Sequence, residues 1–360
     1  MKAAVLHQAL TDLVIEDIAV SKPGPREVLI ATRACGVCHS DLHFIDGLYP
    51  APLPLVPGHE AAGVVEAVGD DVTALKPGDH VVTCFSTFCG RCEYCATGRL
   101  SLCVDASTKR KPNEQPRIAL GDRPVHQLLN VAGYAEQLLV HENGAVAIDP
   151  DMPFDRAALM GCAVVTGAGS VLNTAGVKAG EHVAVIGCGG IGLAAVNAAR
   201  IAGAARIIAV DPVPAKRALA ETMGATDSFD PSADRLREQV VELTKGGVHH
   251  AIEAVGRIAA GELALSLLRR GGTATIVGMM PMHEKLPMRA LDLLAEKKLQ
   301  GCLMGSNRFP VDIPRLVDFY LAGRLDLDSL IAERIPLSEI NGAVGKLRTG
   351  EAARSVVIFE

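Results

Sequence analysis

The second half of the chain alternates short apolar strands with helical stretches, and this alternation restricts the fold more than any other feature. It begins at about Glu181 with the strand VAVIG, continues through IGLAAVNAARIAG and RIIAVD, and reaches a helical stretch over Pro214–Met223. Further strands are predicted at Val248–Glu253 and Thr273–Val277. Strands joined by helices of this length form right-handed crossovers in a parallel sheet. We therefore predict a doubly wound α/β domain over residues 164–300.

A glycine-rich turn directly follows the first of these strands. It matches G-x-G-x-x-G and consists of Gly187, Cys188, Gly189, Gly190, Ile191 and Gly192. Glycines permit a tight turn and the close approach of a pyrophosphate, and the start of the next helix favours its negative charge. Asp211 ends the second strand, where a carboxylate would bind an adenosine ribose and repel a 2′-phosphate. The pattern favours NAD over NADP, and a structural turn beside a surface aspartate is the alternative.

A second motif is a run of four cysteines with the spacing C-x2-C-x2-C-x7-C, in a lobe over residues 86–104. They are Cys89, Cys92, Cys95 and Cys103. Loops this short hold four sulfurs close enough to surround one Zn²⁺ at roughly 2.3 Å each. The segment has little hydrophobic periodicity, so metal bonds would supply its order. Iron–sulfur runs of this kind usually close with a three-residue gap and a proline. The sequence favours structural zinc, with an iron–sulfur or plain thiol cluster as the alternatives.

The first part of the chain, residues 1–163, has a different pattern of short strands separated by Gly and Pro. Examples are Val28–Ala31, Ala62–Val68 and His80–Thr83, which predict a mostly β domain. The strand-like ending RSVVIFE indicates that residues 301–360 return to this domain. A chain of 360 residues has the length expected of about two domains.

Composition argues against several classes of protein. Trp is absent, aromatic residues make up 3%, and the formal net charge is −6. These values disfavour stacking on single-stranded nucleic acid and general polyanion binding. The N-terminus lacks a signal-peptide pattern, and we find no apolar stretch long enough to span a membrane. Ten cysteines point to metal binding in a reducing cytoplasm rather than to disulfides. We therefore expect a cytoplasmic protein without nucleic-acid or membrane partners.

Three further candidate residues are scattered, so spacing alone does not group them. Cys38, His59 and Cys162 could each be a small buried residue or a turn residue. They stand in the segments GVCHSD, GHE and GC. Together with the four-cysteine lobe, the glycine loop and Asp211, these segments resemble the zinc-dependent medium-chain alcohol dehydrogenases over essentially the full length of the chain.

The resemblance implies two zinc ions per chain and a mostly β, GroES-like catalytic domain beside the dinucleotide domain. Cys38, His59 and Cys162 would bind the catalytic zinc, with Glu60 close to it and Asp41 orienting His59. A zinc ion with three protein ligands keeps an open position, where a bound alcohol becomes more acidic. Zinc-alkoxide formation and hydride transfer to the nicotinamide would then give an aldehyde, and the reverse steps would reduce it.

The resemblance also implies a proton relay and several cofactor contacts. Ser40, the cofactor ribose and His43 would carry the alkoxide proton to solvent; a capping serine and a surface histidine are the alternatives. Further implied cofactor contacts are Thr166, Lys216, Val277 and Arg354. Many relatives carry arginine where this chain has His39, so we expect a weaker grip on the pyrophosphate and faster cofactor release.

The resemblance places apolar residues around the substrate, namely Phe85, Leu128, Leu129, Met279 and Leu303. This lining favours primary alcohols with an alkyl, allylic or aromatic tail, although large apolar residues are commonly plain core. The segment over residues 105–130 is nearly as long as in the dimeric branch of that family, so the resemblance implies a homodimer rather than a tetramer.

Two other functions are open. A glutathione- or mycothiol-dependent formaldehyde dehydrogenase shares the zinc and nucleotide motifs. A basic segment could hold its thiol adduct, although we expect it to be a solvated surface; it contains Lys109, Arg110, Lys111 and Arg117. A non-catalytic zinc-binding protein is the alternative outside enzymes, and the acidic balance argues against it.

Overall fold

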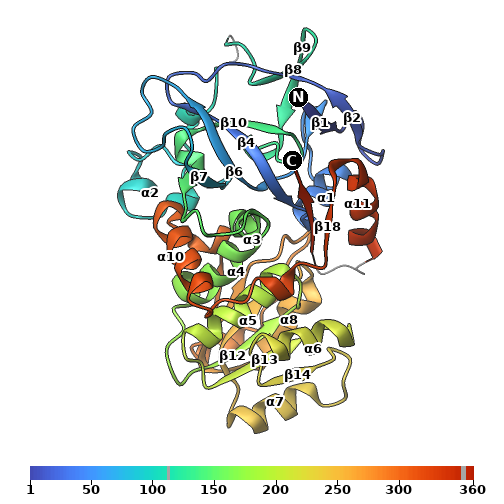
Figure 1. Cartoon of the computed structure of the whole chain (residues 1–360). Coiled ribbons are helices and arrows are strands. Elements are labelled where there is room, and N and C mark those ends of the chain that lie inside the picture. The colour runs from blue at the N-terminus through green and yellow to red at the C-terminus, as the bar shows by residue number, and fades with distance from the viewer. Residues whose placement is uncertain (112–113, 350–353) are drawn as a thin grey trace. The chain divides into compact units, whose positions relative to one another are not determined.

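The computed structural model describes residues 1–111, 114–349 and 354–360, and the chain divides into two compact units (Figure 1). The first unit comprises Met1–Ala163, Arg308–Leu321 and Ile331–Glu360, and the second comprises Val164–Asn307 and Ala322–Leu330. The sequence pattern places the return to the first domain at residue 301. The second unit instead keeps residues 301–307 and a later segment over 322–330.

The second unit is built on a parallel sheet of six strands, in the order β14-β13-β12-β15-β16-β17. The strands are β12 (His182–Ile186), β13 (Arg206–Val210), β14 (Asp227–Phe229), β15 (Val248–Glu253), β16 (Leu268–Ile276) and β17 (Lys298–Gly301). In β12 the run from Val183 to Ile186 is buried throughout, as expected of a strand covered on both faces. The predicted doubly wound α/β fold is confirmed. Its strand order reverses at β12, where such sheets bind ligands at their carboxyl ends.

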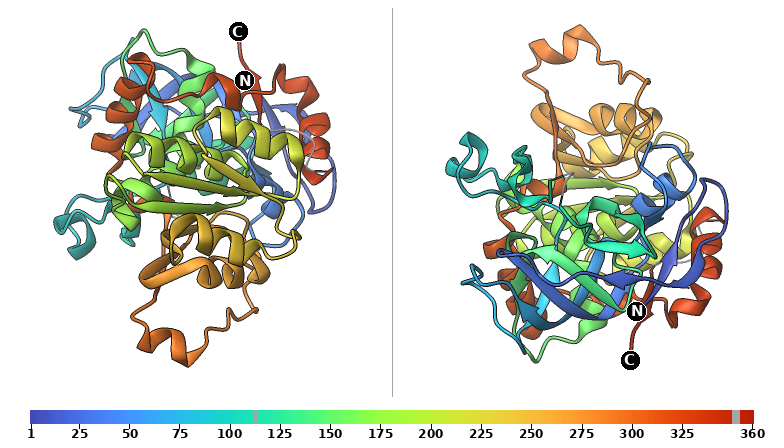
Figure 2. Two further views of the ribbon diagram at one scale, coloured as in Figure 1. Left: turned by 90° about the horizontal axis from the view of Figure 1, so that it is seen from below. Right: turned by 90° about the horizontal axis from the view of Figure 1, so that it is seen from above.

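Helices cover both faces of this sheet (Figure 2). The helices of the second unit are α4 (Val165–Gly169), α5 (Gly190–Ile201), α6 (Pro214–Thr222), α7 (Leu236–Thr244), α8 (Ile258–Leu267) and α9 (Ala290–Leu294). The predicted helix over residues 214–223 corresponds to α6. It begins at Pro214, because proline fits the first helical position, where no N–H is needed.

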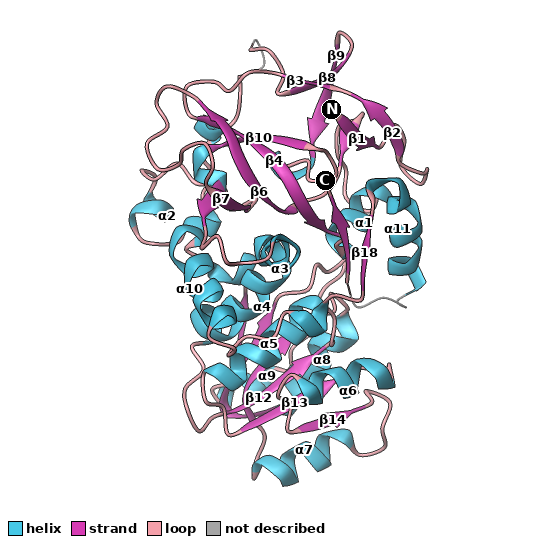
Figure 3. Cartoon of the chain, viewed as in Figure 1, coloured by secondary structure: helices cyan, strands magenta, loops and turns pink. Residues whose placement is uncertain are grey.

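The first unit is mostly β, as predicted (Figure 3). Its largest sheet follows the path β11-β7-β6-β4-β19-β18 with β10 paired to β4, and smaller sheets are β1-β2 and β3-β8-β9-β5. The strands are β1 (Lys2–Val5), β2 (Val14–Asp17), β3 (Ala19–Val20), β4 (Glu27–Gly36), β5 (Leu55–Val56), β6 (Glu60–Val68), β7 (His80–Thr83), β8 (Ile118–Leu120), β9 (Arg123–Gln127), β10 (Gln137–His141), β11 (Ala145–Ala147), β18 (Glu333–Ile335) and β19 (Ser355–Ile358). The last strand, β19, pairs antiparallel with β4, so the chain end does return to this unit.

The helices of the first unit are α1 (His39–Ile45), α2 (Glu93–Ala96), α3 (Phe154–Leu159), α10 (Phe309–Leu321) and α11 (Ile340–Thr349). The core between these elements contains alternate residues of β4, such as Val28 and Ile30, together with Leu138 and Val357. This alternation is the period-two pattern of a strand with one face in the core.

One helical run, Phe154–Ala175, is long and apolar enough by composition to cross a membrane. The expectation that no apolar stretch is long enough is therefore wrong by length and composition. Most of its apolar window is buried within the protein, so its side chains are already covered, as in the core helix of a globular fold.

Candidate active site and metal centres

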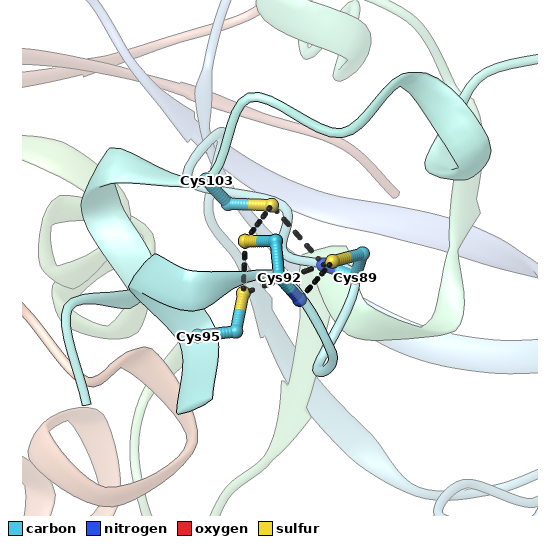
Figure 4. Close-up of side chains that lie close together, drawn as sticks. All are labelled: Cys89, Cys92, Cys95 and Cys103. Carbon is cyan, nitrogen blue, oxygen red and sulfur yellow. Dashed lines mark hydrogen bonds between the residues drawn. The ribbon is translucent and has the colours of Figure 1, made fainter. Parts of the chain in front are cut away.

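The four-cysteine lobe brings its sulfur atoms together (Figure 4). The Sγ–Sγ distances are 3.9 Å for Cys89–Cys95, 3.5 Å for Cys92–Cys95 and 3.8 Å for Cys92–Cys103. A tetrahedron with metal–sulfur bonds of about 2.3 Å has edges of about 3.8 Å. Backbone N–H groups of Arg91 and Cys92 donate to Cys89 Sγ, and that of Cys89 donates to Cys103 Sγ. The spacing and the donors fit one zinc ion held by four thiolates.

Replacing Cys103 by serine should remove this zinc and unfold the lobe locally. Of its four sulfur ligands only Cys95 is buried, so little packing would remain to order the segment. We expect the zinc content to fall by one ion per chain and trypsin to cut after the exposed Arg91 or Arg99. Cys302→Ser, at a half-buried thiol outside both clusters, should keep the zinc content and the protection. An unchanged zinc content in Cys103→Ser would contradict the structural site.

A second cluster joins residues from three parts of the first unit. Cys38 caps the start of α1, His59 directly precedes β6, whose first residue is Glu60, and Cys162 follows α3. Their potential ligand atoms all lie within 4.8 Å of one another, and all four residues are buried. His59 Nε2 is buried without a hydrogen-bond partner among the described residues, which costs free energy unless a metal binds its lone pair. Two thiols and an imidazole suit zinc, so the residues fit the predicted ion.

Asp41 fixes the orientation of His59. Its Oδ1 accepts hydrogen bonds from His59 Nδ1 and from the backbone N–H of Gly58, both at 2.9 Å. Its Oδ2 accepts from the backbone N–H of Cys38 at 3.2 Å and from the hydroxyl of Tyr134 at 2.9 Å. A proton held on Nδ1 leaves the lone pair of Nε2 for a metal. Burial would lower the pKa of His59, but Asp41 and Cys38 raise it well above its ordinary value, so metal binding competes with a second proton.

Glu60 forms a buried ion pair with Arg354. Arg354 Nη1 donates to the two carboxylate oxygens of Glu60 at 3.1 and 3.2 Å, and to the Val37 carbonyl at 3.2 Å. The backbone N–H of Ala163 also donates to Glu60. Burial raises the pKa of Glu60 to about 8, although Arg354 opposes this shift. Arg354 is only 4% exposed, and the acidic partner observed for it is Glu60. Its contact with a cofactor phosphate stays a prediction.

The two predicted relay residues lie on one short helix. Ser40 and His43 are three positions apart on α1 and so share one face. His43 is half-buried, stacks on Tyr49 with ring centroids 5.7 Å apart, and has no partner for Nδ1 among the described residues. Burial lowers the pKa of His43, which keeps the ring neutral near pH 7 and able to accept a proton. His39 begins the same helix and is exposed.

The glycine loop lies at the carboxyl end of β12. Gly187 has a φ of +95°, and a Cβ on Gly192 would lie 1.7 Å from the Gly187 carbonyl oxygen, so the turn itself requires both glycines. Gly189 differs, because its backbone is extended and a Cβ there would meet no protein atom within 4 Å. The open space at Gly189, at the start of α5, suits a ligand phosphate. Gly190 and Ile191 form the first turn of α5.

Asp211 follows β13 at the same edge of the sheet. Its Oδ2 accepts from the backbone N–H of Cys188 at 2.8 Å and its Oδ1 from that of Val213 at 2.9 Å. Each oxygen keeps a further lone pair that a ribose hydroxyl could use. Lys216 lies in the first turn of α6. The neighbouring Arg217 is bound to the Asp211 carbonyl and to the Asp230 carboxylate, which leaves it poorly placed for a 2′-phosphate.

Two other predicted cofactor residues also lie in the second unit. Thr166 is buried in α4, with its hydroxyl 3.3 Å from Met304 Sδ. Val277 directly follows β16, and its N–H donates to the Glu253 carbonyl at 2.9 Å. Val277 therefore shares the carboxyl edge of the sheet with the glycine loop. The helix that carries Thr166 packs on the first turn of α5, since a Cβ on Gly167 would lie 2.2 Å from the Ile191 carbonyl oxygen.

The predicted substrate residues are divided between the units. In the first unit, Phe85 packs edge-on against the His59 ring, with centroids 5.7 Å apart and an angle of 75°. In the second unit, Met279 and Leu303 are 37% and 53% exposed. Phe85 thus contacts a predicted metal ligand directly.

Leu128 and Leu129 line a cavity of about 430 Å³ in the first unit. Leu128 is a member of the hydrophobic core, and Leu129 packs against that core. The apolar part of the cavity wall also includes Phe44, Pro52, Leu55 and Val125. A substrate role for Leu128 and Leu129 stays a prediction, since both also serve packing.

The basic segment before β8 is not solvated throughout, so our expectation for it is wrong at two positions. Arg110 and Arg117 form ion pairs with Glu27, and their side chains are only 16% and 8% exposed. Glu27 lies 83 residues from Arg110 and 90 residues from Arg117 in sequence. The local charge pattern, from which the expectation came, could not reveal this partner. Lys109 and Lys111 are exposed, as expected. Two of these four cations are therefore already paired with Glu27 and are less available to bind the carboxylates of a thiol adduct.

Comparison with known proteins agrees with this geometry. Two family profiles match the chain: "Alcohol dehydrogenase GroES-like domain" over residues 24–150 and "Zinc-binding dehydrogenase" over residues 190–321. An NDMA-dependent alcohol dehydrogenase of Amycolatopsis methanolica is 40% identical, over 99% of this chain and 98% of its own length.

Solved structures give the same result. Benzyl alcohol dehydrogenase of Acinetobacter calcoaceticus is 31% identical, covering 100% of this chain and 99% of its own, with a TM-score of 0.94. A Sinorhizobium meliloti protein described as a zinc-binding dehydrogenase and bound to NADP is 30% identical, covering 99% of each chain, with a TM-score of 0.82. The chain therefore belongs to the zinc-dependent medium-chain alcohol dehydrogenase family, and it is an oxidoreductase.

Proposed function

We propose that this protein oxidises primary alcohols to aldehydes with NAD as the hydride acceptor, and that it catalyses the reverse reduction. The observation that carries the proposal is the buried cluster of Cys38, His59 and Cys162, in which His59 Nε2 has no hydrogen-bond partner within the part of the chain that the structure describes. Ion-free packing gives no reason to bury two thiols beside an unpaired imidazole nitrogen. We also propose two zinc ions per chain, since the Cys89–Cys103 lobe supplies four further sulfur ligands.

The side chains around the cluster divide the work between orientation and proton movement. A zinc ion bound by Cys38, His59 and Cys162 would act as a Lewis acid that lowers the pKa of an alcohol hydroxyl. Asp41 keeps the His59 proton on Nδ1. Ser40 both donates and accepts hydrogen bonds, and the neutral His43 ring has one nitrogen that accepts and one that donates, so this face of α1 can pass the alcohol proton towards solvent.

The cofactor proposal depends on the carboxyl edge of the second unit. The space at Gly189 admits a phosphate, and the buried Asp211 carboxylate would repel an added 2′-phosphate. A related structure binds NADP, so the preference for NAD in this chain comes from Asp211 and from the engagement of Arg217 by Asp230. All ten cysteines are free, which supports a reducing, cytoplasmic location.

The substrate proposal is a primary alcohol with an apolar tail. Phe85 lies against the His59 ring, and one solved relative is a benzyl alcohol dehydrogenase. A panel of benzyl, allylic, medium-chain and polyol substrates, followed by NADH and NADPH absorbance, tests the proposal. We expect turnover of the apolar primary alcohols with NAD. Turnover only of formaldehyde with glutathione or mycothiol would favour the thiol-dependent alternative, and no turnover with about one zinc per chain would favour a non-catalytic protein.

Replacing His39 by arginine should tighten the binding of NADH. His39 begins α1 and is exposed, and an arginine there would add a permanent charge and a bidentate donor for the pyrophosphate. We expect a dissociation constant about tenfold lower, equivalent to about 1.4 kcal/mol. Fluorescence titration with NADH measures it, and His283→Arg, at an exposed histidine of the second unit, is the charge-matched control. Equal or weaker binding by His39→Arg would refute the expectation.

We also propose that the chain forms a homodimer through the edge of the second unit. Strand β17 is the last strand of the six-stranded sheet, and Leu291, Leu293 and Leu294 nearby are 70%, 60% and 82% exposed. An unpaired edge beside exposed leucines is typical of an interface. Leu294→Glu should therefore shift the mass measured by light scattering from dimer to monomer. Leu10→Glu, at a residue 75% exposed in the first unit, should leave the dimer intact; a monomeric wild type would refute the interface.

A further inference from the structure

Asp41 accepts four hydrogen bonds from residues that the structure describes, and of these Tyr134 supplies the one that comes from a side chain outside the metal cluster. The Tyr134 hydroxyl donates to Asp41 Oδ2 at 2.9 Å, and Asp41 Oδ1 binds His59 Nδ1 at 2.9 Å. An ionised carboxylate has about four acceptor positions, so these donors saturate Asp41. Tyr134, Asp41 and His59 are each 0% exposed, so bulk water does not compete for the bonds.

The ring of Tyr134 is held in place by contacts that do not involve its hydroxyl. The backbone N–H of Tyr134 donates to the Pro57 carbonyl at 3.0 Å, and that of Gly133 donates to the Gly58 carbonyl at 2.7 Å. Gly58 has a φ of +87°, and a Cβ there would lie 2.7 Å from Tyr134 Cδ1. The ring therefore packs directly on the turn that precedes His59, and a phenylalanine would occupy the same position.

We propose that Tyr134 is a positioning residue for the catalytic metal site, acting through Asp41 on the His59 imidazole. This inference rests on the proposed function, because it requires that Cys38, His59 and Cys162 hold a metal ion. The hydroxyl stops the Asp41 carboxylate from rotating away from His59 Nδ1. The hydroxyl also stabilises the negative charge of Asp41 by donating a hydrogen bond to it. The carboxylate therefore accepts the hydrogen bond from His59 Nδ1 without taking its proton.

The protonation of Tyr134 agrees with a donor role. Burial raises the pKa of Tyr134 well above its ordinary value, and the adjacent Asp41 raises it further. The hydroxyl therefore keeps its proton and donates. Loss of a direct hydrogen-bond partner of a metal-bound histidine typically costs about 10- to 100-fold in metal affinity or activity. Because Tyr134 acts through one further hydrogen bond, we expect an effect at or below the lower end of this range.

The test compares zinc release from the holoenzymes of wild type and Tyr134→Phe into excess chelator. Each zinc site should give its own kinetic phase of zinc release. The phase of the catalytic site is identified as the one that is missing in His59→Ala, and the phase of the Cys89–Cys103 lobe serves as an internal reference. We expect the catalytic zinc of Tyr134→Phe to leave about 3- to 10-fold faster, with the lobe phase unchanged. In protein with Co²⁺ at the catalytic site, the visible absorption bands should shift, because the field of the imidazole changes.

Thr83→Val is the matched control. Thr83 is 0% exposed, and its hydroxyl donates to the Ala61 carbonyl at 3.1 Å, so the variant loses a buried hydroxyl without touching Asp41. It should lower the melting temperature but keep wild-type zinc release and cobalt bands. If Tyr134→Phe behaves like Thr83→Val, Tyr134 is only structural and the inference fails by itself. If the wild type shows no His59-dependent phase, the proposed metal site fails, and the inference fails with it.

Discussion

Replacing His59 by alanine is expected to lower kcat/KM for an alcohol by about 10³-fold or more and to leave one zinc ion per chain in place of two. A metal Lewis acid supplies several kcal/mol of transition-state stabilisation, and about 4 kcal/mol corresponds to about 10³-fold in rate. With the imidazole removed, two buried thiols and the paired carboxylate of Glu60 are left as ligands. Steady-state kinetics and metal analysis of the purified variant measure both effects.

The control for His59→Ala is a second buried histidine of the same unit. His141 is 6% exposed, and its Nδ1 accepts the backbone N–H of Asn143 at 3.1 Å. His141→Asn keeps an acceptor at that place and should retain two zinc ions and nearly full turnover. If His59→Ala keeps two zinc ions, or loses no more activity than His141→Asn, then Cys38, His59 and Cys162 are not the catalytic centre.

The parts of the site that sequence could predict are those made by local spacing. The four cysteines of the lobe lie within 15 consecutive residues, from Cys89 to Cys103, and the glycine loop follows its strand directly, so chain geometry alone brings these groups together. Cys38, His59 and Cys162 are different, because three separate elements position them. Their grouping could come only from resemblance to a family, and the structure now shows their side chains in one cluster.

Contacts between residues far apart in sequence account for what the sequence did not predict. Tyr134 stands in the otherwise apolar segment VAGYA, where a hydroxyl is its one distinguishing signal, and nothing in that segment points to Asp41. The end of the second unit was misplaced for a similar reason. Residues 301–307 read GCLMGSN, without a clear helical or strand period, yet a Cβ on Gly305 would lie 2.3 Å from the Val165 carbonyl oxygen, and this close packing keeps the segment with the second unit.

The largest stability effect should come from Glu27, which joins the segment over residues 105–117 to the first sheet. Its carboxylate accepts from Arg110 Nε at 3.0 Å, from Arg117 Nε at 2.8 Å and from the backbone N–H of Gly24 at 2.9 Å. Glu27→Gln keeps the shape but removes the carboxylate that pairs with the largely buried guanidiniums of Arg110 and Arg117. Removing one partner of a buried ion pair costs about 3–5 kcal/mol, which for a unit of this size lowers the melting temperature by roughly 10 °C.

Calorimetry at several pH values separates this charge effect from a loss of packing. Burial would raise the pKa of Glu27, but Arg110 and Arg117 hold it below its ordinary value. The stabilisation by Glu27 is therefore complete above the pKa of the unfolded chain, about 4.3, and is lost as the pH falls through the lower folded value. The difference between wild type and Glu27→Gln should then shrink below about pH 4. Asp17→Asn, at the exposed pair with Lys2, should change the melting temperature little at any pH. A Glu27→Gln deficit that persists unchanged into acid would show that volume or hydrogen bonding, rather than charge, anchors the segment.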